Sequence, residues 1–247
     1  MSKPVMQVRN LSIAFGGLRA VDDVTFDVAR HRITTVIGPN GAGKSTLFNL
    51  ISGALKPQAG QIMIDGVDMT GLPPERSKAA GLSRSFQITN LFFELTVAEN
   101  LRLAAQVLEP MSRALLPIAH SDRAGAKVEE LLERFGMASR RHELVSNLSH
   151  GDQRRLEIAV CLASEPKILL LDEPTQGMSH TDTAETAKLV RALSEDVTVL
   201  LIEHDIGLVM ELSDHVVVMH QGRKLAEGTP AEVRADPAVQ AAYFGHA

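Results

Sequence analysis

The fold is decided by Gly38-Pro39-Asn40-Gly41-Ala42-Gly43-Lys44-Ser45, which matches the pattern G-x-x-x-x-G-K-[ST] in full. It follows the apolar run Ile33–Ile37, expected as a buried strand, and precedes a helical run over Lys44–Ile51. A strand, a loop and a helix in this order are the context of a phosphate-binding loop. Its glycines let the backbone wrap a phosphate, and the N–H groups at the start of the helix attract the anion. The stretch therefore predicts nucleotide binding on an α/β fold.

Two side chains of this loop are expected to do the binding chemistry. Lys44 can reach the β- and γ-phosphates of a nucleotide, and Ser45 can ligate Mg²⁺. The alternative is a Gly-rich turn with an exposed lysine, which the two flanking elements make a poor interpretation. The loop alone does not separate a kinase, a GTPase and an ATPase.

A second stretch, Ile168-Leu169-Leu170-Leu171 followed by Asp172-Glu173-Pro174, narrows the choice. The apolar run predicts a buried strand that delivers Asp172 to its carboxyl end, where α/β sheets bind ligands. We expect Asp172 to help hold Mg²⁺ and Glu173 to polarise water as a general base. Two solvated acids at a strand end are common in general, but less so beside a phosphate loop. A small-molecule kinase needs no such base, because its substrate brings the hydroxyl.

A third stretch, Leu148-Ser149-His150-Gly151-Asp152-Gln153, opens a predicted helix. Ser149 is expected as the N-cap, and the free N–H groups behind it form an anion site. In isolation this is simply a good helix start.

The composition bounds the class of protein. Of 247 residues 45% are hydrophobic, so a sizeable core is available and a disordered chain is excluded. The formal net charge of −5 gives no global attraction for nucleic acid. The single Cys161 excludes an intrachain disulfide and a Cys-based zinc site and fits a reducing compartment. No apolar run approaches the roughly 18 residues of a membrane helix, and the start of the chain does not read as a secretory signal.

The rest of the chain alternates between element types. The first third predicts mostly antiparallel strands, the middle predicts helices, and the last third predicts alternating strands and helices of parallel βα units. Thr229-Pro230 is expected to cap a terminal helix. The strands expected in the first third are Val5–Arg9, Ser12–Phe15, Val24–Ala29, Ile33–Ile37 and Gln61–Asp65. The helices expected in the middle are Val97–Val107, Asp122–Phe135 and Gly151–Ala163.

With these three stretches, the chain resembles the ATP-binding-cassette family. GPNGAGKST, LSHGDQRR and ILLLDEP occur in the family's order and at its usual separations, and the resemblance covers Val5 to Gly245. It implies an α/β fold with a P-loop NTPase core of the ABC ATPase type. It further implies one cassette domain over 1–247, with an antiparallel β subdomain and an α-helical subdomain inserted at about 90–160.

The resemblance also implies site residues that local pattern alone would not assign. Gln87 in LSRSFQ matches the glutamine that senses Mg²⁺ and the attacking water, and His204 matches the switch histidine at the γ-phosphate. Phe15 matches the aromatic residue that stacks on adenine, with core filling as its alternative. The implied catalytic residues are Glu173, His204 and Gln87, and the implied Mg²⁺ ligands are Ser45, Gln87 and Asp172. The implied ATP contacts are Phe15, Gly38, Pro39, Asn40, Gly41, Ala42, Gly43, Lys44, Ser45, Thr46, Ser149 and Gly151.

A family member of this kind works as an ATP sandwich. Two cassettes meet head to tail, and Ser149 and Gly151 of one contact the nucleotide held by the phosphate loop of the other. Three positions depart from the usual pattern, namely His150, Asp152 and Ser179.

Finer features resemble the longer ATPase of importers for branched-chain amino acids, urea or short amides. These features are RSFQITNLFFELTVAENL, the excursion Leu108–Ser121, LIEHDIGLVMELSD and GTPAEVRADPAVQAAYFG. The implied partners are two integral membrane permease subunits, a second ATPase or a homodimer partner, and indirectly a periplasmic substrate-binding protein. The implied location is the cytoplasmic face of a bacterial membrane, with no nucleic acid partner.

The apolar run Leu91-Phe92-Phe93, just after Gln87, predicts a docking surface for a membrane subunit. Its alternative is the helical subdomain's own core, which we expect for one or two of the three. Two other functions stay open for the chain. One is an ABC ATPase that exports lipid or lipopolysaccharide, and the other is a soluble regulatory or DNA-associated ATPase.

Overall fold

The computed structural model describes residues 3–85, 91–109 and 122–244 of the chain. The chain divides into two compact units. The first unit comprises Met1–Arg84, Lys167–Pro174 and Val190–Ala247, and the second comprises Ser85–Pro166 and Thr175–Leu189. The predicted insert at 90–160 falls inside the first segment of the second unit. Its standing as a separate subdomain stays a prediction.

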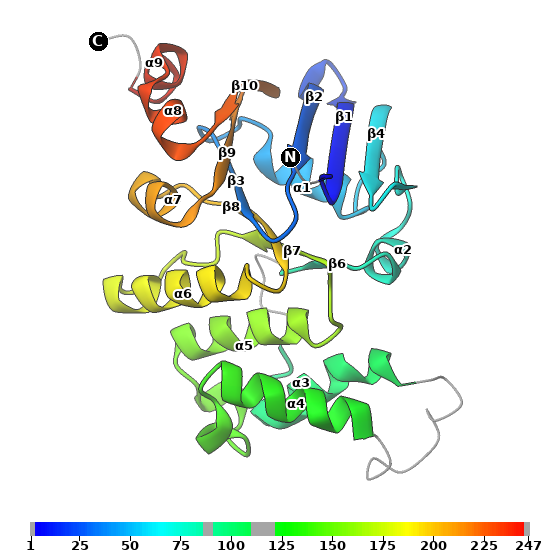
Figure 1. The fold of residues 1–247 in the computed structure, drawn as a ribbon, viewed down its shortest axis with the longest axis vertical. Helices are drawn as coiled ribbons and strands as arrows, with labels where there is room; N and C mark the ends of the chain where they lie inside the picture. Colours follow the sequence, from blue (N-terminus) through cyan, green and yellow to red (C-terminus); the bar gives the residue numbers. More distant parts are fainter. Residues whose placement is uncertain (1–2, 86–90, 110–121, 245–247) are drawn as a thin grey trace. The chain divides into compact units, whose positions relative to one another are not determined.

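The first unit contains an antiparallel sheet with the strand order β2-β1-β4-β5 (Figure 1). Buried residues alternate with more exposed ones along most of β1 and β2, so one face of the sheet is buried. The strands are β1 (Met6–Phe15), β2 (Leu18–Val28), β4 (Ala59–Ile64) and β5 (Val67–Asp68).

Two strands expected at Val5–Arg9 and Ser12–Phe15 are one strand, β1, so this prediction is wrong in detail. The pairing register of β1 shifts after Val8, and Asn10 has a φ of 48°. Asparagine tolerates this left-handed conformation, and its amide donates to Asp23 Oδ1 at 2.7 Å. A β-bulge near Asn10 therefore lets β1 continue through a residue that the sequence suggests as a boundary between two strands.

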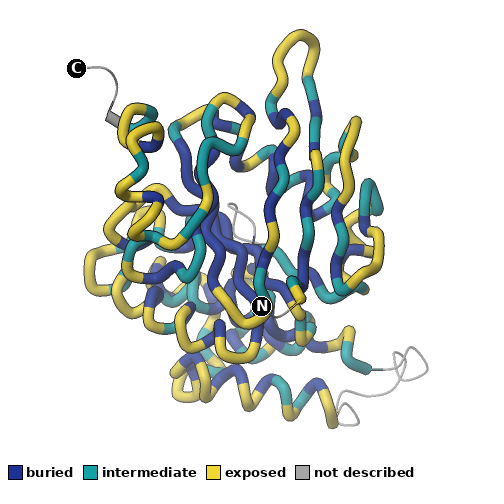
Figure 2. Tube along the Cα trace, turned by 45° about the horizontal axis from the view of Figure 1, so that its top comes forward, coloured by how far each residue is buried: buried dark blue, intermediate teal, exposed yellow. Residues whose placement is uncertain are grey.

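A second sheet of the first unit has the order β10-β9-β3-β8-β7-β6, and all its pairs are parallel except β10 with β9. The strands β3, β7 and β8 are buried at every residue, as expected of a sheet covered on both faces (Figure 2). Their carboxyl ends therefore meet at one edge of the sheet. The strands are β3 (Ile33–Ile37), β6 (Leu82–Arg84), β7 (Ile168–Asp172), β8 (Thr198–Ile202), β9 (His215–His220) and β10 (Arg223–Gly228).

Among the described residues, five helices lie wholly within the first unit. Helix α1 buries Leu47, Phe48, Leu50 and Ile51 in the main apolar core. Thr229 caps α8 through a capping box with Glu232, which confirms the predicted helix start. The helices are α1 (Lys44–Ile51), α2 (Pro74–Ala79), α7 (Ile206–Leu212), α8 (Pro230–Ala235) and α9 (Pro237–Phe244).

The second unit is helical, as predicted. Thr96 caps α3 (Val97–Ala105) through a capping box with Glu99, and this helix packs against α4 (Asp122–Arg134) and α5 (His150–Leu162). Helix α6 (His180–Leu193) begins in this unit and ends in the first. Most of the excursion Leu108–Ser121 lies outside the described residues. Within the described residues, no helix has the length and hydropathy of a membrane span.

Candidate nucleotide and catalytic site

The phosphate loop joins β3 to α1, and close backbone approach explains its glycines. A Cβ on Gly38 would lie 2.2 Å from the carbonyl oxygen of Met219, and one on Gly43 would lie 2.2 Å from that of Ala20. Gly43 also has a φ of 98°, which L side chains rarely adopt. The backbones of β9 and β2 therefore lie against the two ends of the loop, at Gly38 and Gly43, where only glycine fits.

The turn between β9 and β10 fastens this loop to the antiparallel sheet. The Gly222 N–H donates to the Ala42 carbonyl at 3.1 Å, and the Asp22 N–H donates to the Gly222 carbonyl at 2.8 Å. Asp22 is also paired with Arg19 and Arg223. The loop is thus held from β2 and β10 as well as from β3.

Lys44 lies inside the loop. Its ammonium donates to the carbonyls of Gly38 at 2.7 Å and Pro39 at 3.1 Å. Burial lowers the pKa of Lys44, while the charges of Glu173 and Asp172 act in the opposite direction. The cation and the two acids are therefore close enough to interact electrostatically. Ser45 is exposed at the first turn of α1, and Thr46 beside it is half-buried.

The strand β7 ends at Asp172, which is 4% exposed. Its Oδ2 accepts from Arg84 Nη2 at 3.1 Å. Glu173 follows with a φ of 46°, a left-handed conformation that costs energy for a residue with a side chain. Its N–H donates to the Ile202 carbonyl at 3.0 Å, so the neighbouring strand β8 holds this turn in place.

His204 follows the end of β8 and is more than half exposed. Its Nδ1 lies 3.8 Å from Glu173 Oε1 and 3.8 Å from Glu203 Oε2. Glu203 is fully buried, and its carboxylate accepts the His204 N–H at 3.0 Å. The parallel sheet thus brings Lys44, Asp172, Glu173 and His204 together at its carboxyl edge.

The donors at this edge suit magnesium bound together with a nucleotide. A serine hydroxyl and one buried carboxylate are oxygen ligands, and Mg²⁺ usually takes one or two carboxylates plus substrate phosphates. Among the described residues no group of three His, Cys, Asp or Glu could hold a metal without a nucleotide. Ser45 and Asp172 therefore fit the ion, while Gln87, the third predicted ligand, lies outside the described residues.

Phe15 is 49% exposed at the end of β1, so the core-filling alternative is wrong for this residue. The side chain is free to meet a ligand face, and its stacking on adenine stays a prediction.

In the second unit, Ser149 is the N-cap of α5, as predicted. Its hydroxyl accepts from the Asp152 N–H at 3.2 Å and donates to Asp152 Oδ2 at 2.6 Å. Burial alone raises the pKa of Asp152, but hydrogen bonds from Ser149 and Arg140 and the charges of Arg140 and Arg155 bring it below its usual value. Asp152, one of the atypical positions, is therefore an ionised anchor for the predicted ATP-contacting hydroxyl.

Gly151 faces the start of α6. A Cβ there would lie 3.2 Å from the Asp182 carboxyl carbon, which explains a small residue at this position. Ser179 accepts from the Asp182 N–H at 3.2 Å and donates to its carboxylate at 2.7 Å. The atypical Ser179 thus has a local role at the start of this helix.

Two side chains of the site were not predicted. Arg84 stands in the stretch quoted for Gln87, yet nothing in its spacing marks it as a partner of Asp172. Glu203 ends an apolar strand, which is a weak signal for a buried carboxylate. Both depend on pairing between strands that lie far apart in sequence.

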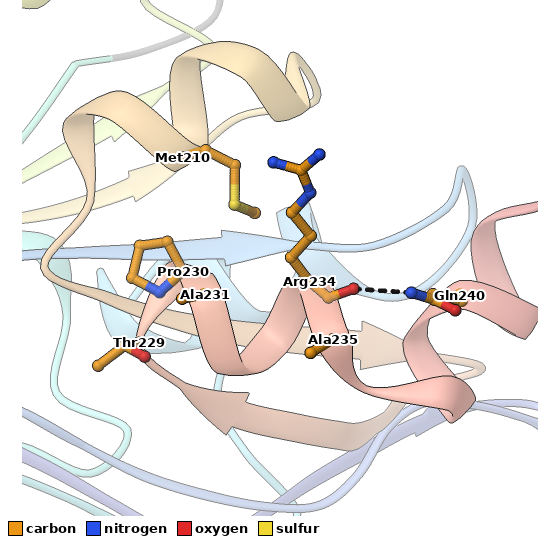
Figure 3. A pocket seen from close by; sticks show the side chains of 7 residues that line it. All are labelled: Met210, Thr229, Pro230, Ala231, Arg234, Ala235 and Gln240. Carbon is orange, nitrogen blue, oxygen red and sulfur yellow. Dashed lines mark hydrogen bonds between the residues drawn. The ribbon is translucent and has the colours of Figure 1, made fainter.

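A separate hollow of about 640 Å³ lies between α7, α8 and α9 (Figure 3). Its lining includes no carboxylate, the Thr229 hydroxyl donates to Glu232 Oε2 at 2.9 Å, and Gln240 donates to the Arg234 carbonyl at 3.0 Å. It is therefore distinct in chemistry from the carboxyl edge of the sheet. The lining residues are Met210, Thr229, Pro230, Ala231, Arg234, Ala235 and Gln240.

Comparison with known families agrees with this geometry. The family described as ABC transporter matches residues 21–176, which include the phosphate loop, the cap of α5 and the end of β7. The chain belongs to the ABC transporter family. It is thus an ATP-binding cassette that hydrolyses ATP, and the fold class predicted from the sequence is confirmed. A second family, described as Branched-chain amino acid ATP-binding cassette transporter, matches residues 223–247 of the cassette.

Several known proteins are similar to this cassette over their whole length. The high-affinity branched-chain amino acid transport ATP-binding protein LivG of Escherichia coli (strain K12) is 42% identical, with 100% of both chains covered. BraF of Pseudomonas aeruginosa, with the same description, is 41% identical and equally covered. The lipopolysaccharide export protein LptB of Haemophilus influenzae is 31% identical, with 98% and 97% covered.

A solved structure gives the same fold. The ADP conformation of the cassette MJ1267 has a TM-score of 0.87 and 30% identity, covering 99% of this chain and 100% of the other. Binding of a nucleotide by a cassette of this fold is therefore observed directly in a similar protein.

Proposed function

We propose that this cassette is the ATPase subunit of a membrane importer for branched-chain amino acids. The observation that carries the proposal is full-length similarity to LivG and BraF, reinforced by the C-terminal match over residues 223–247. The cargo does not touch this chain, so its identity rests on these relatives. The ATPase activity rests on the site itself.

The geometry supports a division of labour among the site residues. Lys44 would bind the β- and γ-phosphates, and Phe15 would stack on adenine. Ser45 and Asp172 would hold Mg²⁺, which supplies positive charge between the phosphates. Glu173 would accept hydrogen bonding from the attacking water and polarise it, since its carboxylate is held at the end of β7.

His204 would act beside Glu173. Its exposed ring is 3.8 Å from that carboxylate, and the buried Glu203 fixes the His204 backbone. The ring would therefore contact the γ-phosphate from the end of the neighbouring strand. Gln87 would complete the set, and its role stays a prediction.

The N-terminal cap of α5 would contact the nucleotide held by a second cassette. Gly151 offers a backbone N–H at a helix N-terminus, which suits a phosphate oxygen. The Ser149 hydroxyl, which donates to Asp152 Oδ2, would turn its proton towards the phosphate when the nucleotide binds. Hydrolysis would then require a dimer, formed with an identical chain or with a different ATPase.

A membrane subunit would dock on the second unit beside the Gln87 segment. Phe92 and Phe93 are 59% and 40% exposed, and Leu144 is exposed in the segment that pairs with theirs. Leu91, by contrast, is 7% exposed, so for this residue the docking interpretation is wrong and the core alternative is right. The apolar surface of Phe92 and Phe93 suits a helix of a permease subunit, which would place the cassette at the cytoplasmic face of the membrane.

The two alternatives have weaker support. The exporter ATPase LptB is 31% identical, against 42% for LivG. A DNA-associated role would need a basic surface, which the net charge of −5 does not favour.

Isolation of the tagged chain from detergent-solubilised membranes of its source cells tests the proposal. We expect two integral membrane proteins in the complex. Vesicles containing this complex and its periplasmic binding protein should accumulate radiolabelled leucine when ATP is supplied. Urea and acetamide serve as comparison cargoes. Recovery without integral membrane proteins, or transport of lipid but not leucine, would overturn the importer.

A further inference from the structure

We propose that Arg84 is a positioning residue that aligns the phosphate-loop helix with the Mg²⁺-binding aspartate. This proposal rests on the proposed Mg²⁺-ATP site and adds a residue to it. Arg84 ends β6 and its side chain is only about 10% exposed. The residues that Arg84 contacts on α1 and β7 belong, like Arg84 itself, to the first unit.

The guanidinium of Arg84 joins two elements that must bind one nucleotide together. One nitrogen, Nη1, donates to Asn49 Oδ1 at 2.6 Å and to Ser52 Oγ at 3.0 Å, both at the end of α1. The other, Nη2, donates to Asp172 Oδ2 at 3.1 Å. The same group lies 6.0 Å from the ring centre of Phe48, also on α1. A planar fork of this kind fixes the orientation of its acceptors more firmly than an ammonium does.

The position of Arg84 in the chain adds a second consequence. The chain leaves the first unit directly after Arg84 and leaves it again after Pro174, two residues beyond Asp172. The strands that carry these exits, β6 and β7, are paired neighbours. The Arg84–Asp172 ion pair therefore ties the two exits together.

This arrangement assigns Arg84 a defined effect on the metal. Arg84 donates to Oδ2 of Asp172 at 3.1 Å and so fixes the orientation of this carboxylate. Groups that hydrogen-bond a metal ligand orient it, and their loss typically costs about 10–100-fold in metal affinity or activity. Because Arg84 acts on Asp172, whereas Lys44 is held by the carbonyls of Gly38 and Pro39, binding of ATP without Mg²⁺ should depend on Arg84 little.

The test compares Arg84→Gln and Arg84→Lys with Arg191→Gln. Arg191 pairs with Asp214 at 3.0 Å at the amino end of the same sheet, so it controls for the loss of an Arg–Asp pair. We would measure ATP affinity in EDTA, the Mg²⁺ dependence of hydrolysis, and the rise in Tm when Mg²⁺ is added to the ATP-bound protein.

In Arg84→Gln we expect ATP affinity without metal to stay within about threefold of wild type. The Mg²⁺ concentration for half-maximal hydrolysis should rise by about 10-fold or more. The Mg²⁺-dependent rise in Tm should shrink, and Arg84→Lys should fall between, since it keeps the charge and loses the fork. Arg191→Gln should match wild type in both Mg²⁺ readouts.

A variant with normal Mg²⁺ dependence and only a lower Tm would overturn the proposal and leave Arg84 as a structural ion pair. If Arg84→Gln does not fold, a folded Arg84→Lys with wild-type Mg²⁺ readouts would overturn it equally. A wild-type chain that does not bind ATP would instead sink the proposed function.

Discussion

Oε1 of Glu173 and Nδ1 of His204 lie 3.8 Å apart, at the ends of the adjacent parallel strands β7 and β8. This separation is longer than a hydrogen bond, so the two groups are not hydrogen-bonded to each other. A carboxylate and an imidazole in this relation are suited to hold a water and a phosphate oxygen side by side.

Replacement of Glu173 by glutamine should separate binding from chemistry. The amide keeps the shape of the side chain and loses its basicity, so hydrolysis should fall by about 10²–10⁴-fold. ATP binding should remain, and an ATP-dependent dimer should accumulate because repulsion of the γ-phosphate is also removed. Size-exclusion chromatography with ATP and Mg²⁺ measures the dimer. Hydrolysis at the wild-type rate would show that Glu173 is not the base.

Lys44→Ala should abolish tight nucleotide binding. The change removes a buried cation that would face several phosphate charges, an interaction of the charge-assisted kind. Calorimetric titration with ATP gives the affinity, and Lys188→Ala, on the exposed face of α6, is the matched loss of one lysine. Equal affinities of the two variants would contradict the assignment of the loop.

Gly43→Ala should be far more damaging than Gly17→Ala. At Gly43 the added Cβ would meet the Ala20 carbonyl at 2.2 Å, and the φ of 98° is unfavourable for alanine. At Gly17 no atom lies within 4 Å of the added carbon. We expect a clear loss of Tm for the first variant and almost none for the second. Similar Tm values would show that β2 does not press on the loop.

Because the Tyr243 hydroxyl is buried, we expect the free energy of unfolding to fall in alkaline solution. Its hydroxyl is buried, is directed to the Gly38 backbone, and has no hydrogen bond of normal geometry among the described residues. Burial raises the pKa of Tyr243 to about 12 from an ordinary 10.0. The folded state thus holds the proton more tightly, so this stability is complete below pH 10 and is lost as the pH rises towards 12.

Two measurements check this. Tyr243 is the single tyrosine and the chain has no tryptophan, so tyrosinate absorbance reports it alone. Unfolding by denaturant across this pH range should be less pH-dependent in Tyr243→Phe. An ordinary tyrosine titration in the folded protein would refute the prediction.

Phe92→Asp with Phe93→Asp should spare ATP binding and weaken assembly with the membrane subunits. Two buried carboxylates without partners would oppose an apolar helix at that surface. Leu91 is left unchanged, because it is core and its replacement would unfold the unit. Val67→Asp, on an apolar side chain exposed to a similar degree on β5, is the control. Normal assembly and transport by the double variant would rule out docking there.

The sequence predicts the parts of this cassette whose signals are local. The strand Ile33–Ile37 and the helix Lys44–Ile51 have the predicted bounds, because an apolar run and the adjoining phosphate loop mark them. The phosphate loop, Asp172 and the Ser149 cap are likewise marked by short patterns. His204 could be proposed only by resemblance, since a histidine at a strand end has no signal of its own.

The parts that escaped prediction depend on contacts across long distances in sequence. The role of Arg84 depends on its hydrogen bonds to Asn49 and Asp172, and no sequence-spacing rule links these residues to it. The edge strand β6 is only three residues long, and β10 is largely polar. Leu91 and Phe92 are adjacent apolar residues with opposite exposure, which only the packing of the second unit decides.

The left-handed backbone of Glu173 lowers the stability of the fold, whereas its carboxylate is expected to support ATP hydrolysis. Glycine or asparagine would relieve the strain at this position, by an amount of order 1 kcal/mol. A library of variants chosen only for survival at high temperature should therefore be enriched in these residues at position 173, and its members should no longer split ATP. A library selected for ATP turnover should instead keep glutamate at position 173, at the expense of some stability.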